Sequence, residues 1–118
     1  DIHGTITFEQ IIKEMKNLAK ELGVELECFQ TNNEGEFINR IHQAYFDKID
    51  GLVIHAGAWS HYSIGIRDAV EILEGIPICE VHMSNIYKRE VFRHHSVLSD
   101  IVQGEIVGCI LLFIWIGR

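Results

Sequence analysis

The chain has 118 residues, which is enough for one domain with a hydrophobic core and too few for two. Hydrophobic residues make up 47% and charged residues 23%, a composition that excludes a disordered chain. The net charge of −7 argues against general nucleic-acid binding, which relies on clustered Lys and Arg side chains. We therefore expect a single globular domain over residues 1–118.

In the first part of the chain, helical and strand-like patterns alternate. Thr7 and Gln10 form a capping-box pair that opens a helix, and Gly23 ends it. Val24–Gln30 alternates apolar with acidic residues, which predicts a strand. Glu34–Phe46 follows as a second amphipathic helix.

The second part predicts five more elements. They are a strand at Leu52–Ile54, a helix at Ser63–Leu73, a strand at Ile76–His82, a short helix at Asn85–Phe92 and a strand-like run at Glu105–Ile114. Alternating strands and helices indicate an α/β fold with a mostly parallel sheet. Ligands bind beyond the carboxyl ends of such strands. These exits are Thr31–Asn33, His55–His61 and His82–Ser84.

The cysteines and the last apolar run bear on the cellular setting. Cys28, Cys79 and Cys109 are odd in number and have apolar neighbours, so we expect buried reduced thiols. Ile106–Ile116 is about eleven residues long, too short for a helix that crosses a bilayer of ~30 Å. No secretory signal is recognised, and we expect a cytoplasmic protein without a membrane partner.

The stretch Glu80–Ser96 concentrates groups that transfer protons or bind anions. Period-two geometry puts Glu80, His82 and Ser84 on one side of the predicted strand. A carboxylate favours the charged form of a neighbouring imidazole, so His82 could act as a general acid. The alternative is a core histidine that is satisfied by a hydrogen bond to Glu80.

Two other pairs have a functional and a structural interpretation. Arg89 and Arg93 are four apart on a predicted helical turn and would share a face. They could bind a carboxylate or hydroxyl groups, or they could be solvated or ion-paired. His61 and Asp68 are seven apart, so they could project together from a helix start as a ligand-orienting pair or belong to a cap region.

Other reaction types have little support in the sequence. Nucleophile elbows, electropositive cysteines and phosphate-binding loops are missing. No spacing among the seven histidines matches a zinc motif. We therefore expect acid–base chemistry on a small acid, with no metal and no cofactor.

The chain resembles type II 3-dehydroquinate dehydratase, and the resemblance covers roughly residues 2–108. The matching motifs are Gly4-Thr5, Asn32-x-Glu34-Gly35, Asp50-Gly51, Gly57-Ala58-Trp59-Ser60-His61-Tyr62-Ser63, Ile66-Arg67-Asp68-Ala69, Ile76-Pro77, Glu80-Val81-His82-Met83-Ser84-Asn85-Ile86 and Arg89-Glu90-x-Phe92-Arg93-His94-His95-Ser96. The resemblance implies a flavodoxin-like three-layer sandwich, in which the family's first strand and lid loop would precede Asp1.

The family's activity is that of a hydro-lyase of the shikimate pathway. It converts 3-dehydroquinate to 3-dehydroshikimate by anti elimination through an enolate, without a cofactor, and usually in a trimer-based dodecamer. By position, His82 corresponds to the general acid and Glu80 to the residue that orients it. His3 stands where the family has its tyrosine base. Met83 and Ser84 correspond to the cradle for the substrate carboxylate.

The resemblance also implies further substrate contacts. His61 and Arg93 fall where the family contacts the ring hydroxyls, and Arg89 falls on the arginine that flanks the lid. Asp68 falls where a neighbouring subunit completes the site. His55 stands in place of a substrate-binding asparagine.

Departures from the family pattern leave a second function open. The departures are His3, His55, the lid loop expected before Asp1 and the apolar run Cys109–Arg118. The alternative is a catalytically impaired relative that serves as a small-acid-binding or oligomeric scaffold protein. A flavodoxin-like nucleotide-binding module is disfavoured, since no phosphate loop is found.

Overall fold

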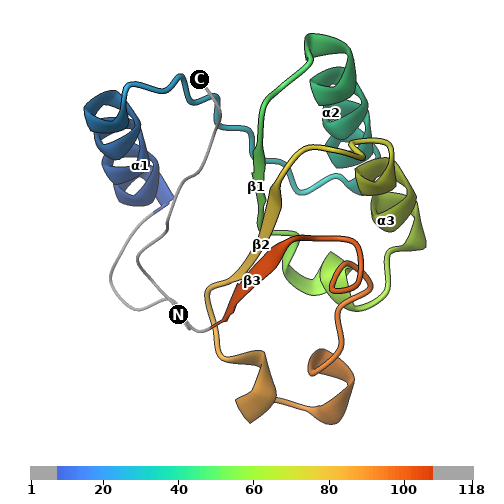
Figure 1. Ribbon diagram of the computed structural model, residues 1–118. Coiled ribbons are helices and arrows are strands. Elements are labelled where there is room, and N and C mark those ends of the chain that lie inside the picture. Colours follow the sequence, from blue (N-terminus) through green and yellow to red (C-terminus); the bar gives the residue numbers. More distant parts are fainter. Residues whose placement is uncertain (1–7, 108–118) are drawn as a thin grey trace.

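The computed structural model describes residues 8–107, which form an α/β fold around a three-stranded parallel sheet (Figure 1). The strands, in spatial order, are β1 (Leu52–Ile54), β2 (Ile78–His82) and β3 (Gly104–Val107). All neighbouring strands are parallel, so their carboxyl ends meet at one edge of the sheet. The predicted α/β class and parallel sheet are confirmed.

In the described part of the chain, three α-helices flank this sheet: α1 (Phe8–Leu22), α2 (Glu34–Asp47) and α3 (Ile64–Glu71). Helices α2 and α3 pack together on one side of the sheet, and α1 lies on the other side (Figure 1). Local caps set two of the helix starts. The Asn33 side chain accepts a hydrogen bond from Glu36 N at 2.9 Å, and Ser63 Oγ accepts one from Ile66 N at 3.0 Å.

The main hydrophobic core lies between the sheet and helices α2 and α3. Its most buried members are Ile66 and Leu98, both 0% exposed. The core continues through these buried side chains: Ile41, Ala44, Ile54, Ala56, Ala69, Val70, Leu73 and Ile78. Strand β2 is paired with β1 on one side and with β3 on the other, so the side chains at its carboxyl end have neighbours on both sides.

The predicted strand Val24–Gln30 is wrong. Within residues 8–107, no segment pairs with it, and β1 is an edge strand. A cavity of about 1150 Å³ is lined by α1, by the chain after α1, by α2 and by β1. A strand requires a neighbour for its N–H and C=O groups. The alternation of Leu26 and Cys28 with Glu25 and Glu27 is typical of a strand, but such a pattern does not by itself provide a partner strand.

The predicted short helix Asn85–Phe92 is also wrong. The segment contains two separate 3₁₀ turns, η2 (Ile86–Lys88) and η3 (Val91–Arg93). Asn85 begins the first by accepting a hydrogen bond from Tyr87 N at 3.1 Å, but Arg89 is extended, with φ −108° and ψ −167°. An extended residue cannot continue the i to i+4 ladder, so the two turns point their side chains independently.

The other predicted elements are confirmed to within one or two residues. Gly23 follows the last residue of α1, as predicted, and has a left-handed conformation with φ 73°. Thr7 of the predicted capping box lies outside the described residues. The same holds for the part of the predicted Glu105–Ile114 run that follows Val107.

The prediction of buried thiols is wrong for Cys28. Cys28 is exposed and borders the cavity, because no strand within residues 8–107 pairs with the segment that carries it. Cys79 on β2 is partly buried, and both are free thiols. Cys109 lies outside the described residues.

Candidate active site

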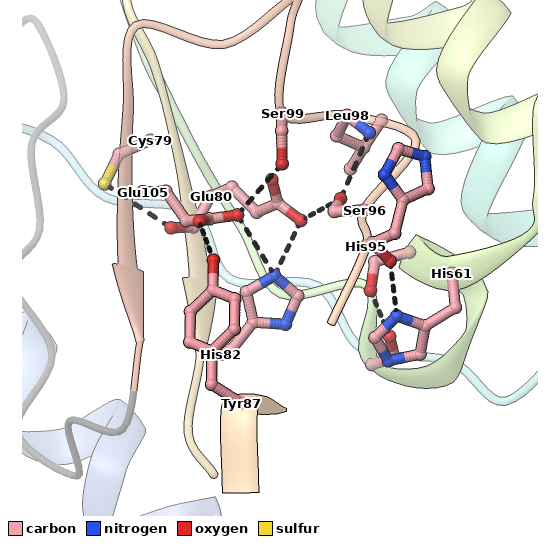
Figure 2. Close-up of polar contacts among 12 residues, drawn as sticks. His61, Cys79, Glu80, His82, Tyr87, His95, Ser96, Leu98, Ser99 and Glu105 are labelled. Carbon is pink, nitrogen blue, oxygen red and sulfur yellow. Dashed lines mark hydrogen bonds and ion pairs between the residues drawn. The ribbon is translucent and has the colours of Figure 1, made fainter. Parts of the chain in front are cut away.

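Glu80 and His82 form a buried pair on β2. They are two residues apart on one strand, so both side chains lie on the same face. His82 Nε2 lies 2.7 Å from Glu80 Oε2, and the side chains are 3% and 0% exposed (Figure 2). The predicted contact between the two residues is confirmed.

Glu80 is held as a carboxylate by its hydrogen bonds. Burial by itself raises its pKa, but donation from His82 and from Ser96 and the attraction of His82 outweigh burial and lower it. Ser96 Oγ donates to Glu80 Oε2 at 2.5 Å and accepts from Leu98 N at 3.1 Å. An ionised carboxylate only accepts hydrogen bonds, so His82 Nε2 carries the shared proton. The other ring nitrogen of His82, Nδ1, can then exchange a proton with a ligand.

A second carboxylate reaches the same imidazole from the neighbouring strand. Glu105 on β3 lies directly opposite Glu80, and its Oε2 is 3.7 Å from His82 Nε2. Tyr87 OH donates to Glu105 Oε1 at 3.4 Å, and Ser99 Oγ donates to Glu105 Oε2 at 3.2 Å. The Glu105 charge raises the pKa of the Tyr87 hydroxyl, which keeps it as a donor.

No sequence pattern predicts a role for Glu105, Ser96 or Tyr87. The position of Glu105 depends on the strand register, which local patterns do not encode. Ser96 lies within the polar stretch that the sequence singled out, but its partner is 16 residues away. The sequence feature that could have indicated a role for Ser96 in the site is its position at the end of that polar stretch.

His61 lies beside His82, as expected for a residue of the same site. It ends η1 (Gly57–His61), and its ring stacks with that of His82 at 6.2 Å between centroids and an interplanar angle of 18°. His61 Nδ1 donates to the His95 carbonyl oxygen at 2.8 Å, so the ring is fixed by a segment far along the chain (Figure 2). Val97 N donates to Ser60 O at 2.7 Å and holds the two segments together.

Asp68 does not share a helix with His61, so the predicted joint projection of the two side chains is wrong. Ser63 begins a new helix after η1 ends at His61, and Asp68 is an exposed residue of α3. The seven-residue spacing corresponds to two helical turns only if the helix is continuous. Here an N-cap interrupts it.

The two arginines do not share a helical face, because Arg89 is extended. Arg89 Nη1 donates to Ser84 Oγ at 3.5 Å, whereas Arg93 Nε donates to Glu90 Oε1 at 2.8 Å. Ser84 lies after β2 ends at His82, so period-two geometry does not extend to it. Arg89 therefore lies beside a residue expected to bind a carboxylate, and Arg93 is ion-paired.

Two expected substrate-binding residues border the large cavity. His55, in the loop after β1, and Met83, directly after β2, both line it, and Glu80 and His82 do not. His3 lies outside the described residues. The structure therefore brings His61 to the central pair and places His55 and Met83 at the adjacent cavity.

Among residues 8–107, one group of side chains could bind a metal ion. Glu80, His82 and Glu105 each offer a ligand atom, and these atoms lie within 4.8 Å of one another. Carboxylate and imidazole ligands are typical of zinc sites. The same three residues can therefore perform acid–base chemistry or hold a cation.

Comparison with known proteins identifies the family. Residues 1–112 match the family described as dehydroquinase class II. A 3-dehydroquinate dehydratase from Leptothrix cholodnii is 56% identical over 106 residues, which cover 90% of this chain and 70% of the relative. A 3-dehydroquinate dehydratase from Pelobacter propionicus is 53% identical over 106 residues, which again cover 90% of this chain and 70% of the relative.

Solved structures agree with this assignment. A type II dehydroquinase from Butyrivibrio crossotus has a TM-score of 0.88 and 39% identity, and the match covers 92% of this chain and 76% of that one. A type II dehydroquinase from Propionibacterium acnes has a TM-score of 0.86 and 44% identity, covering 92% and 74%. The chain belongs to the class II dehydroquinase family.

Proposed function

We propose that this protein is a 3-dehydroquinate dehydratase, a hydro-lyase that forms 3-dehydroshikimate and water from 3-dehydroquinate. The observation that carries the proposal is the buried 2.7 Å contact between His82 Nε2 and Glu80 Oε2 at the carboxyl edge of a parallel sheet. Relatives with this activity in their names are more than half identical to the chain. The family and the paired site point to the same reaction.

The reaction requires an acid and a base. Glu80 keeps the Nε2 proton of His82 in place, so the protonated ring has a second proton on Nδ1 to give. We assign His82 Nδ1 as the donor to the departing hydroxyl, which leaves as water after an enolate has formed. His3 is proposed as the base that removes the carbon-bound proton beside the carbonyl. No cofactor is proposed for either step.

The proposed substrate contacts extend from the pair toward the cavity. Met83 and Ser84 directly follow β2, where they are proposed to bind the substrate carboxylate, with Arg89 beside Ser84. We assign the ring hydroxyls to His61, which stacks on His82, and to Arg93.

We place His55 among the substrate-binding residues as well. It lines the cavity next to the site, where it can meet a ligand that extends beyond His82. The chemical role follows from its imidazole, which can donate to or accept from a hydroxyl group.

We further propose that the protein assembles as a trimer-based dodecamer in the cytoplasm. Asp68 is exposed on α3, where a neighbouring copy could use it to complete a site. Large apolar side chains are exposed in the segments around the site, which supports burial in an assembly. They are Tyr62, Ile64, Tyr87, Val91 and Phe92. No helix among the described residues is long and apolar enough to cross a membrane.

Turnover of 3-dehydroquinate tests the proposal. The product is a conjugated enone, so its ultraviolet absorbance should rise with time in the wild type. His82→Asn should lower kcat by about a hundredfold or more, because it removes the acid. The matched control is His42→Asn on α2, outside the site, which should keep the wild-type rate. Binding of quinate without turnover would favour the impaired relative, and absence of both would contradict the proposal.

A further inference from the structure

We propose that Glu80, His82 and Glu105 form a zinc-binding site and that zinc bound there inhibits the dehydration. Zinc binding stands independently, whereas the inhibition rests on the proposed function. The three residues come from the adjacent strands β2 and β3, so the sheet itself holds the ligand set together.

The distances fit a small cation. Zinc binds imidazole nitrogen and carboxylate oxygen at about 2.1 Å, so two ligands of a tetrahedral site lie about 3.4 Å apart. His82 Nε2 lies 2.7 Å from Glu80 Oε2 and 3.7 Å from Glu105 Oε2. All three ligand atoms lie within 4.8 Å of one another. Small side-chain adjustments therefore suffice to bring them to zinc distances, and the second oxygen of Glu80 or a water can supply the fourth ligand.

A buried oxygen without a partner points to a ligand in the same place. Glu80 is 0% exposed, and its Oε1 atom makes no hydrogen bond to any described residue. A buried carboxylate oxygen without a donor costs free energy, and a cation that binds both oxygens removes that cost. Zinc held by Oε1 and Oε2 would give a partner to Oε1, which has none among residues 8–107.

The charges also match. Glu80 and Glu105 are direct cross-strand neighbours, an arrangement in which like charges repel. Among the described residues, His82 is the ion-pair partner recorded for both carboxylates. One imidazolium neutralises one of two negative charges, whereas a divalent cation neutralises both. Glu105 is 23% exposed, which gives a cation a way in from solvent.

Zinc bound to Nε2 of His82 would prevent the proposed donation of a proton to the departing hydroxyl. Binding to Nε2 replaces the proton that His82 shares with Glu80, and an imidazolium releases one proton to solvent. The ring then keeps a single proton on Nδ1 as a neutral, metal-bound imidazole, a far weaker acid than imidazolium. His82 therefore cannot protonate the departing hydroxyl until the metal leaves.

Cobalt(II) titration of the full chain tests binding without reference to activity. Wild type should show the visible absorption bands of a tetrahedral cobalt site, and zinc should displace them. Glu105→Gln preserves size and removes one ligand charge, so the dissociation constant should rise about tenfold or more. The matched control, Glu74→Gln at an exposed position beyond α3, should bind cobalt like wild type.

A second variant and a spectral marker exclude other sites. His82→Asn removes the imidazole and should weaken cobalt binding as Glu105→Gln does. A sulfur-to-cobalt charge-transfer band would reveal binding by cysteines such as exposed Cys28 and would overturn the proposal. Equal affinity in wild type and Glu105→Gln would also overturn it. Circular dichroism confirms that each variant is folded.

Enzyme assays test the inhibition separately. Zinc should inhibit wild type and Glu74→Gln equally, a chelator should restore activity, and Glu105→Gln should need about tenfold or more zinc for the same inhibition. Equal zinc sensitivity of Glu105→Gln would overturn the inhibitory role. If the protein binds cobalt at this site but lacks turnover, the proposed function fails and the zinc site remains.

Discussion

Glu80 and Glu105 lie directly opposite each other on β2 and β3, and both carboxylates approach Nε2 of His82. The like charges would repel in the absence of the imidazole between them. Ser96 supplies a further donor to the buried member of the pair. The site is therefore a coupled group of charges, and its stability depends on each donor that reaches Glu80.

Removing the Ser96 hydroxyl should destabilise the fold. Ser96→Ala deletes a 2.5 Å donor to a fully buried carboxylate, so the free energy of unfolding should fall by about 1–3 kcal/mol. Urea denaturation near neutral pH measures the change. Ser99→Ala removes a 3.2 Å hydrogen bond to Glu105 at an exposed site and should cost less. A larger loss in Ser99→Ala would contradict this account of the buried carboxylate.

The lowered pKa of Glu80 predicts acid sensitivity. The folded-state pKa lies below the ordinary value of 4.5, so the unfolded chain binds the proton more readily. The stabilisation by the Glu80 charge is complete above that value and is lost as pH falls through the folded-state pKa. The difference in the free energy of unfolding between wild type and Glu80→Gln should shrink as the pH falls below about 4.5. A pH-independent difference would show that the Glu80 charge does not contribute.

His61 should affect substrate binding more than the chemical step. Its ring is fixed by donation to the His95 carbonyl and stacks beside His82, but Glu80 rather than His61 holds the acid. His61→Asn should raise KM about tenfold with a smaller change in kcat. Steady-state assays beside His42→Asn measure both constants. A loss confined to kcat would place His61 in the chemical step instead.

The unpaired segment after α1 should exchange its amide hydrogens rapidly. Residues 25–30 make no ladder to another strand among residues 8–107, whereas β2 has neighbours on both sides. Amide hydrogen exchange should therefore show low protection over residues 25–30 and high protection over β2. Equal protection of the two segments would show that a partner strand is present in solution.

The sequence alone predicted much of the local structure, because local signals lie close together in the chain. Asn33 and Ser63 are caps that act within three residues, and they mark where α2 and α3 begin. The pairing of Glu80 with His82 followed from the two-residue period of a single strand. The motifs were also sufficient to indicate the family, which the comparisons with known proteins confirm.

Only the tertiary structure placed the groups that depend on a neighbouring segment. The alternation in Val24–Gln30 is that of a strand, but no described segment provides its hydrogen-bond partners. Arg89 and Arg93 separate because the chain between them leaves the helical conformation. Glu105 reaches His82 through the register of β3 on β2, and Ser96 reaches Glu80 through a loop closure. Such contacts join residues far apart in the chain, so periodicity and local propensity cannot specify them.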